Sequence, residues 1–232
     1  MRNENINWIV FDADDTLLDF KAAQKEAFTR MLLSLGFEDR KDYLETYNRL
    51  NRGLWRALER GEIQKQELIE KRFRLFCDHY DLQGFDGKMK LSYEEELSKG
   101  GDIIAGAREV LEELSMNYPL ALASNGILSI QRGRLDASGI RSYFDEIIIS
   151  EETGFEKPQK GFFDIMMSRI GQDDPKKILF IGDSLPSDML GAVNYGLLSC
   201  WYNPGENVST LKVDYIVTSL EQIPALVKNL VI

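Results

Sequence analysis

Two short apolar segments, far apart in the chain, are each followed by a cluster of acidic residues. The apolar segments are residues 6–11 and 177–181, and both are rich in β-branched and aromatic side chains. Segments of this length and composition are typical of strands buried on both faces of a sheet. The acidic residues that follow them are Asp12, Asp14, Asp15, Asp183 and Asp188. Because parallel strands end at one edge of their sheet, we expect the two clusters to meet there.

Bringing these carboxylates together has an electrostatic cost. Two like charges about 4 Å apart repel by roughly 4 kcal/mol at an effective dielectric constant of about 20. The site therefore needs a positive partner, and a divalent cation is the simplest one. One acidic loop alone is equally well a solvated turn, and Asp188 alone would suit the first turn of a helix. The repetition favours a metal site, with Asp12, Asp14, Asp183 and Asp188 as candidate ligands.

The rest of the pattern predicts the fold. From about residue 21 to 99 the chain is highly charged, with apolar residues at helical spacing. From about residue 100 short apolar runs alternate with helical patterns, which predicts a parallel sheet covered on both faces. We therefore expect an α/β fold: a doubly wound, Rossmann-like parallel sheet with an inserted α-helical cap. The expected core domain comprises residues 1–17 and 99–232, and the expected cap comprises residues 18–98.

Composition limits the partners of the chain. Its 232 residues are 44% hydrophobic and carry a formal charge of −10, which argues against binding to a nucleic-acid polymer. No apolar stretch is long enough to span a bilayer, and the short polar N-terminus does not resemble a signal peptide. Cys77 and Cys200 have neither metal-ligand nor disulfide spacing, which favours a cytoplasmic location. The oligomeric state, monomer or homodimer, stays open.

Two further loops that follow predicted strands supply a hydroxyl group, main-chain amides and a lysine. One is Ser124-Asn125-Gly126, and the other is Lys157-Pro158. A hydroxyl and main-chain amides at a helix N-terminus bind phosphate oxygens, and a lysine offsets the remaining charge. Taken alone, Ser124 is more often a helix N-cap, and Lys157 is more often a solvated surface residue. Taken with the acidic clusters, they favour phosphoryl transfer to or from a small phosphate monoester.

The first acidic loop supplies two different chemical groups for that reaction. Asp12 is placed to attack phosphorus and form an aspartyl-phosphate, which divides one difficult step into two. Asp14, two residues on, is placed to protonate the leaving oxygen and later to activate water. Mg²⁺ prefers hard oxygen ligands and retains some of its waters, so it suits carboxylates from two loops plus a phosphate oxygen.

The order of these motifs resembles the haloacid dehalogenase superfamily of phosphohydrolases. The matching motifs, in chain order, are Asp12-x-Asp14-x-Thr16, Ser124-Asn125, Lys157-Pro158 and Gly182-Asp183 with Asp188. The resemblance implies an α-helical cap, Asp12 as nucleophile and Asp14 as acid and base, with Thr16, Ser124 and Lys157 as further catalytic residues. It also implies Mg²⁺ held by Asp12, the Asp14 carbonyl and Asp183, with support from Asp188.

A narrower resemblance is to the bacterial pyrimidine 5′-nucleotidases that act on nucleoside monophosphates, including noncanonical ones. It rests on the first acidic loop and on residues 51–55, 150–152 and 199–201. Asp15 departs from the glycine frequent in the superfamily but is similar to this subgroup. Substrate-binding candidates are Ser124, Asn125, Gly126, Lys157 and Trp55, although Trp55 is also a candidate for the cap core.

Other activities remain as alternatives. A sugar-phosphate phosphatase or a phosphomutase of the same superfamily would use the same motifs. A 2-haloacid dehalogenase needs neither a second acid at Asp14 nor a metal ligand at Asp183. A phosphoaspartate receiver domain needs neither that second acid nor a helical insertion. The last two alternatives are therefore disfavoured.

Overall fold

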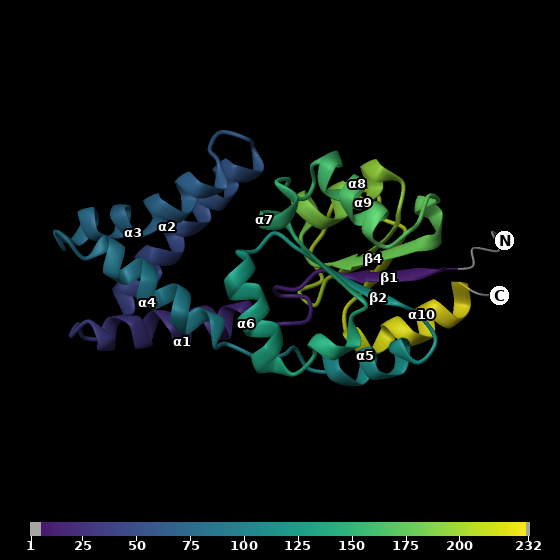
Figure 1. Ribbon diagram of the computed structural model, residues 1–232, viewed down its shortest axis with the longest axis horizontal. Helices are drawn as coiled ribbons and strands as arrows, with labels where there is room; N and C mark the ends of the chain where they lie inside the picture. Colours follow the sequence, from purple (N-terminus) through teal and green to yellow (C-terminus); the bar gives the residue numbers. More distant parts are fainter. Residues whose placement is uncertain (1–5, 231–232) are drawn as a thin grey trace. The chain divides into compact units, whose positions relative to one another are not determined.

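A computed structural model describes residues 6–230 and contains a six-stranded parallel sheet (Figure 1). The strand order is β3-β2-β1-β4-β5-β6. The strands are β1 (Trp8–Phe11), β2 (Leu120–Ser124), β3 (Glu146–Ile149), β4 (Ile178–Gly182), β5 (Leu198–Tyr202) and β6 (Tyr215–Val217). Each pair of neighbours is parallel, so every strand ends at the same edge of the sheet.

Helices cover both faces of this sheet. They are α5 (Ala107–Ser115), α6 (Leu128–Ser138), α7 (Ser150–Thr153), α8 (Lys160–Arg169), α9 (Leu190–Tyr195) and α10 (Ile223–Leu230). Successive side chains of a strand point to opposite faces. Ile9 and Phe11 accordingly join a core cluster with α5 and α10, whereas Val10 joins a second cluster with α8 and α9. The predicted doubly wound α/β fold is confirmed.

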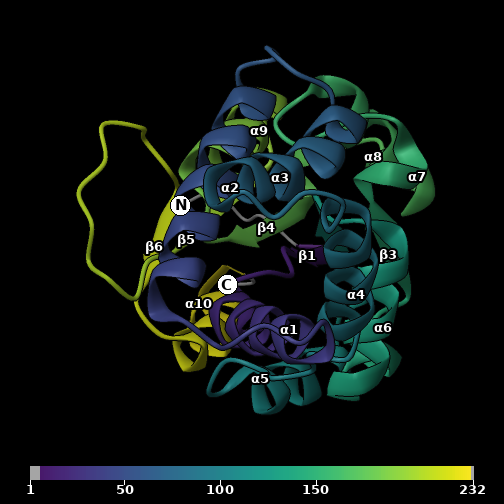
Figure 2. The same cartoon turned by 90° about the vertical axis from the view of Figure 1, so that its left-hand side faces the viewer.

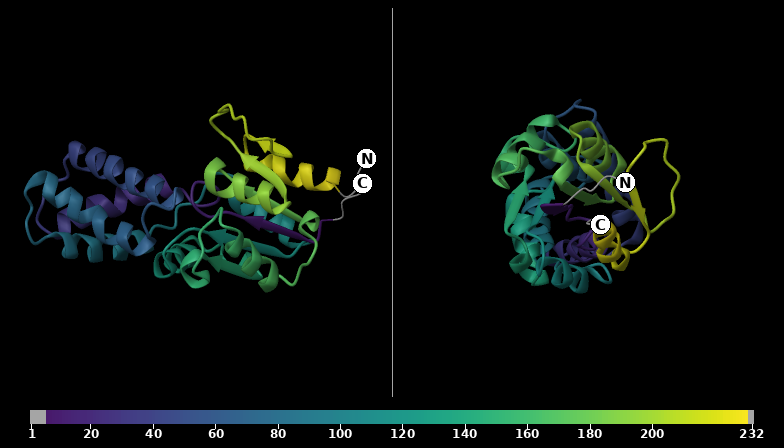
Figure 3. Two further views of the ribbon diagram at one scale, coloured as in Figure 1. Left: turned by 90° about the horizontal axis from the view of Figure 1, so that it is seen from above. Right: turned by 90° about the vertical axis from the view of Figure 1, so that its right-hand side faces the viewer.

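The other helices belong to a second compact unit. The chain divides into a unit that includes the described residues through Phe20 and those from Gly101 onward, and a unit of residues Lys21–Gly100. The helices are α1 (Phe20–Ser34), α2 (Lys41–Glu59), α3 (Lys65–Tyr80) and α4 (Asp86–Ser98), as Figure 3 shows. Aromatic rings fill the interior of the second unit, where Tyr47 lies 5.1 Å from Phe73 and 5.4 Å from Tyr93 between ring centroids. Calling these units core and cap domains remains a prediction.

Two predicted elements differ from the structure. The first strand begins at Trp8 rather than at residue 6, because the ladder to β4 starts with the pair Trp8 and Ile178. The helix expected at residues 186–194 is a π-helical turn, Leu185–Met189, followed by α9. The turn is wide because two consecutive amides, those of residues 188 and 189, both donate to the Ser184 carbonyl at 3.0 Å.

The segment between β5 and β6 projects from the sheet unit as an extended loop (Figures 2 and 3). Val208 in this loop is 96% exposed. Within residues 6–230, no helix has both the length and the apolar character that crossing a bilayer requires.

Candidate active site

The candidate site lies where the strand order reverses. β1 is flanked by β2 on one side and by β4 on the other, so the chain leaves the sheet centre in both directions. Crevices beyond the strand ends at such a point are the usual ligand sites of open α/β sheets. Asp12 directly follows β1, and its amide donates to the Ile181 carbonyl of β4 at 2.8 Å. Asp183 directly follows β4.

Three carboxylates converge at this edge, as the sequence predicted for the two acidic clusters. Asp12, Asp183 and Asp188 each offer one oxygen, and these oxygens lie within 4.8 Å of one another. Asp188 comes from the π-helical turn and is 1% exposed. A Cβ atom at Gly182 would lie 2.4 Å from Asp188 Oδ2, so glycine is required there for the carboxylate to approach the strand end.

Lys157 enters the same cluster from a loop distant in sequence. Its Nζ donates to Asp12 Oδ1 at 2.6 Å and to the Ala123 carbonyl at 2.7 Å. It also forms an ion pair with Asp188 Oδ1 at 2.7 Å. The Lys157 side chain is 1% exposed, which excludes the alternative of a solvated surface lysine.

Burial and charge perturb the titration of this cluster. The pKa of Asp12 lies well above its ordinary value. Burial of the carboxyl group is the largest cause, and the charge of Asp188 is the second. Burial, followed by the charges of Asp188 and Asp15, raises the pKa of Asp183 to about 7. Burial lowers the pKa of Lys157, but its ion pairs with Asp12 and Asp188 outweigh that effect and raise the pKa. Burial and repulsion between the acids thus both disfavour the ionised forms of Asp12 and Asp183 when no cation is bound.

The donor set of the cluster fits a hard divalent cation. Three carboxylates face one lysine, so an added cation would offset the excess negative charge. Carboxylate oxygens are the ligands that such cations prefer. Asp183 is also held in place around this position. Its carbonyl accepts from Trp201 Nε1 at 2.8 Å, and its Oδ1 lies 3.5 Å from the donating hydroxyl of the buried Thr16.

Of the four acidic side chains expected to converge, Asp14 is the one whose carboxylate lies outside the cluster. The chain turns sharply after β1, with Asp15 in the left-handed region at φ 59° and its amide donating to the Leu18 carbonyl at 2.8 Å. The Asp14 carboxylate is bound instead by two residues of α6. Gln131 Nε2 donates to Asp14 Oδ2 at 2.6 Å, and Arg134 Nη1 donates to Asp14 Oδ1. A role for the Asp14 carbonyl remains a prediction.

The loop after β2 precedes α6, which begins at Leu128 as predicted. The Leu128 amide donates to Glu151 Oε2 at 2.7 Å, so a protein carboxylate already binds the first amide of this helix. Asn125 braces the lysine loop: its Nδ2 donates to the Lys157 carbonyl at 2.9 Å, and its Oδ1 accepts from the Lys157 amide at 2.8 Å. Phosphate binding by Ser124 and by the amides of Asn125 and Gly126 stays a prediction.

Trp55 belongs to the other compact unit. It lies on α2 and is half-buried, unlike the fully buried aromatic residues of that unit such as Phe73. Its role in substrate binding therefore stays a prediction.

Two residues next to the site were missed by the sequence reasoning. Gln131 and Arg134 lie one turn apart on α6 and are 2% and 0% exposed. The sequence signal for them was their spacing: a glutamine and an arginine three residues apart lie on one face of a helix that packs on a sheet. Buried polar side chains need hydrogen-bond partners. Because this helix follows the Ser124 loop, the spacing indicated a polar partner near the strand ends.

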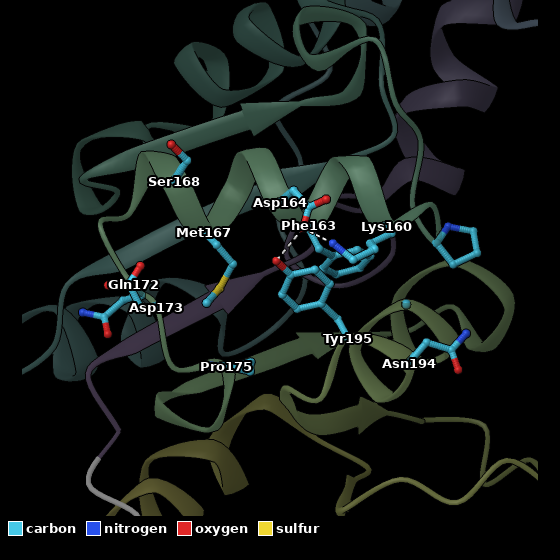
Figure 4. A pocket seen from close by; sticks show the side chains of 12 residues that line it. Lys160, Phe163, Asp164, Met167, Ser168, Gln172, Asp173, Pro175, Asn194 and Tyr195 are labelled. Atoms are coloured by element: carbon cyan, nitrogen blue, oxygen red, sulfur yellow. Dashed lines mark hydrogen bonds and ion pairs between the residues drawn. The ribbon is translucent and has the colours of Figure 1, made fainter.

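A separate hollow lies outside the acidic cluster, between α8 and α9. It has a volume of about 790 Å³ and is lined by residues including Lys160, Phe163, Asp164 and Tyr195 (Figure 4). Three of its polar side chains bind one another: Asp164 Oδ1 accepts from Lys160 Nζ at 2.6 Å and from the Tyr195 hydroxyl at 2.8 Å. None of the predicted site residues lines it.

A family model agrees with the motifs and the geometry. The model described as haloacid dehalogenase-like hydrolase matches residues 6–196 of the chain. The chain belongs to the haloacid dehalogenase-like hydrolase family. The match includes all the predicted motifs of this hydrolase, from the Asp12 loop to Asp188.

Bacterial relatives of this hydrolase cover nearly all of its length. The pyrimidine 5′-nucleotidase PynA of Streptococcus pneumoniae is 36% identical over 219 residues, which are 93% of the chain and 92% of PynA. The pyrimidine 5′-nucleotidase YjjG of Escherichia coli is 31% identical over 225 residues, which are 95% of the chain and 97% of YjjG. The predicted resemblance to this subgroup is therefore confirmed.

A solved structure is similar to this hydrolase as well. The HAD-hydrolase YfnB of Bacillus subtilis, in a crystal structure bound to magnesium, matches with a TM-score of 0.90 and 32% identity. The match covers 96% of this chain and 99% of YfnB.

Proposed function

We propose that this protein is a Mg²⁺-dependent phosphatase that acts through an aspartyl-phosphate on Asp12, with pyrimidine nucleoside 5′-monophosphates as substrates. The observation that carries the proposal is the buried contact of Asp12 with Lys157, beside Asp183 and Asp188 at the strand ends. A carboxylate held at a fixed position next to a cation site is the requirement for in-line attack on phosphorus. Membership of a hydrolase family supports the same chemistry.

In the first half-reaction, an Asp12 carboxylate oxygen attacks the phosphorus atom of the ester. The bond from phosphorus to the ester oxygen breaks, and its electron pair stays on the leaving oxygen. Asp14 donates a proton to that oxygen, so the product leaves as a neutral alcohol. Lys157, whose Nζ is 2.6 Å from Asp12 Oδ1, fixes the orientation of the nucleophile and stabilises negative charge on the transferring group.

In the second half-reaction, Asp14, now ionised, takes a proton from a water molecule. The oxygen of that water attacks the phosphorus of the aspartyl-phosphate, and the bond from phosphorus to Asp12 breaks. Inorganic phosphate leaves, Asp12 is again a carboxylate, and Asp14 is again protonated. Both half-reactions use the same pair of residues from one loop.

The acidic cluster would hold the cation during both steps. Asp12, Asp183 and Asp188 supply carboxylate oxygens, and Thr16 and Trp201 fix Asp183. When bound, Mg²⁺ supplies charge stabilisation to the phosphoryl oxygens and a template for their orientation. The magnesium bound to YfnB supports the choice of cation.

The identity of the substrate rests on the relatives and is tested by a substrate screen. PynA and YjjG are pyrimidine 5′-nucleotidases, and both match over most of the chain. We expect kcat/KM for uridine and cytidine 5′-monophosphates to exceed that for purine monophosphates and sugar phosphates, measured as Mg²⁺-dependent phosphate release. A higher kcat/KM for a sugar phosphate would overturn the substrate. Transfer of phosphate to a sugar hydroxyl without net release would indicate a phosphomutase.

The acid role of Asp14 predicts a dependence on the leaving group. We expect Asp14→Asn to lower kcat by about 10²-fold to 10⁴-fold on a nucleoside monophosphate, whose alkoxide needs a proton to leave. On p-nitrophenyl phosphate, whose phenolate leaves readily, the loss should be much smaller. Steady-state kinetics with both esters provide the measurement. Equal losses on the two esters would contradict the acid role.

Metal binding by the cluster predicts a change in stability. Adding Mg²⁺ to protein stripped of metal should raise its free energy of unfolding, because a ligand that binds only the folded state stabilises it. At a concentration 100 times the dissociation constant the gain is about 2.7 kcal/mol. Thermal unfolding with and without Mg²⁺ measures the effect. Asp183→Asn should reduce the gain, whereas Asp164→Asn, which changes an acid outside the cluster, should leave it intact.

A further inference from the structure

Arg134 is a buried cation whose guanidinium contacts Asp14. Its side chain is 0% exposed, and its Nη1 donates to Asp14 Oδ1. The guanidinium carbon also lies 5.5 Å from the centre of the Phe20 ring. A planar guanidinium presents its donors in fixed directions, whereas a lysine ammonium is a rotatable point charge, so the contact through Nη1 has a defined direction. Arg134 therefore limits the orientations of the Asp14 carboxylate.

Gln131 joins the same carboxylate to the loop after β2. Its Nε2 donates to Asp14 Oδ2 at 2.6 Å and to Ser124 Oγ at 2.8 Å. The two Asp14 oxygens thus have different partners on α6, one turn apart. The other partner of Gln131 is the Ser124 hydroxyl, for which the sequence predicts phosphate binding. A single amide group therefore contacts two side chains at the ends of β1 and β2, which are neighbours in the sheet but distant in sequence.

The environment of Gln131 indicates a role other than stabilising the fold. Gln131 Oε1 is buried and has no hydrogen-bond partner among the described residues. A buried polar atom without a partner costs about 1–3 kcal/mol. A methionine of similar size would avoid this cost in a helix that packs on the sheet. Side chains retained at such a cost are expected at functional sites.

Gly126 provides the space that Gln131 occupies. A Cβ atom at Gly126 would lie 2.2 Å from Gln131 Cγ and 2.6 Å from Gln131 Nε2. Any side chain at position 126 would therefore displace the amide group from Asp14 and Ser124. A substitution at Gly126 therefore displaces Gln131 while leaving its amide group chemically unchanged.

We propose that Gln131 and Arg134 are positioning residues for phosphate-ester hydrolysis, which hold Asp14 in register with Ser124. The inference rests on the proposed function, because it takes Asp14 as the acid that protonates the leaving oxygen. It adds a prediction that the family motifs do not contain. Displacing either residue impairs protonation of the leaving oxygen and leaves the nucleophile and the acidic cluster unchanged.

The test measures kcat across para-substituted phenyl phosphates, from p-nitrophenyl to p-methylphenyl, with Mg²⁺ present. The variants are Gln131→Met, which removes the donors at similar size, Gly126→Ala, which displaces Gln131, and Arg134→Lys, which keeps the charge but loses the planar guanidinium. We expect each to lower kcat on p-methylphenyl phosphate by about 10-fold to 100-fold, part of the range for general acid catalysis. On p-nitrophenyl phosphate we expect a loss in kcat of less than about 3-fold, because that leaving group needs little protonation.

A control on the same helix separates this effect from a disturbance of α6. Arg132 is 52% exposed and pairs with Glu152 at 2.7 Å. Arg132→Met should retain the wild-type ratio of the two rates. Should Arg134→Lys fail to fold, Gln131→Met and Gly126→Ala still decide the inference, since neither removes a buried charge.

A double variant distinguishes positioning from general damage. If Gln131 acts through Asp14, adding Gln131→Met to Asp14→Asn should change kcat on p-methylphenyl phosphate by less than about 2-fold, since residues that act as a unit are not additive. If the losses in kcat of the two single variants multiply in the double variant, the two residues act independently and the inference is overturned. The inference would also be overturned if each single variant lowered kcat equally on all esters while Asp14→Asn lowered it selectively on p-methylphenyl phosphate. If the wild type releases no phosphate, or Asp12→Asn retains activity, the proposed function itself fails.

Discussion

The Asp12→Asn variant is expected to lose turnover by about 10⁴-fold or more while keeping its fold. An amide nitrogen or oxygen does not replace the carboxylate as a nucleophile, so no aspartyl-phosphate forms. The substitution also removes one charge from a group of carboxylates in which burial and the charge of Asp188 raise the pKa of Asp12. Lys157 keeps Asp188 as a charged partner at 2.7 Å in this variant, so stability in the absence of metal should stay close to that of the wild type.

Three measurements check this expectation. Phosphate release gives turnover, thermal unfolding gives stability, and mass spectrometry of acid-quenched protein detects one added phosphoryl group on the peptide that contains Asp12. Asp164→Asn is a matched control, because Asp164 is an acid on α8 that binds Lys160 and Tyr195 and is not in the cluster. Wild-type turnover in Asp12→Asn, or a phosphoryl group on another residue, would refute the nucleophile assignment.

The second large effect is expected for Lys157→Met. Lys157 is buried and is paired with both Asp12 and Asp188, at 2.6 and 2.7 Å. Removing one partner of a buried ion pair leaves an uncompensated charge and typically costs about 3–5 kcal/mol. We expect a loss of that size in the free energy of unfolding of metal-free protein, measured by urea denaturation. Turnover should fall as well, because the orientation of Asp12 depends on this contact.

A surface lysine provides the comparison for this variant. Lys160 pairs with Asp164 at 2.6 Å, but its side chain is 78% exposed. Exposed pairs contribute about 0–1 kcal/mol, so Lys160→Met should have little effect. Mg²⁺ should stabilise Lys157→Met more than it stabilises the wild type, because the cation then replaces the missing positive charge. A loss in Lys157→Met no larger than that in Lys160→Met would show that the buried pair is not important for stability.

The acidic cluster could be predicted from the sequence because it depends on chain connectivity. Asp12 and Asp183 each follow an apolar run, and parallel strands bring their ends to one edge whatever the loops between them do. The same reasoning applies to the alternation of strands and helices that predicted the fold. Lys157 was predicted by its motif, and its burial then came from the structure.

The environment of Asp14 could not be predicted in this way. Its carboxylate binds Gln131 and Arg134, more than a hundred positions away, and that contact depends on how α6 is rotated against the loop after β1. The start of α6 shows the same limit: the Leu128 amide donates to Glu151, 23 positions away in the sequence. The spacing of Gln131 and Arg134 indicates a buried polar target, but it does not identify Asp14 as that target.

The amino-acid sequence by itself determined which residues stand at the strand ends, because strand position and side-chain alternation follow from local hydrophobic periodicity. Only the tertiary structure decided which of those side chains share a partner. Asp12 and Asp183 lie in one cluster, whereas Asp14 faces α6. The physical reason is that hydrogen bonds and ion pairs act over about 3 Å, a distance that depends on the packing of whole elements rather than on the order of residues.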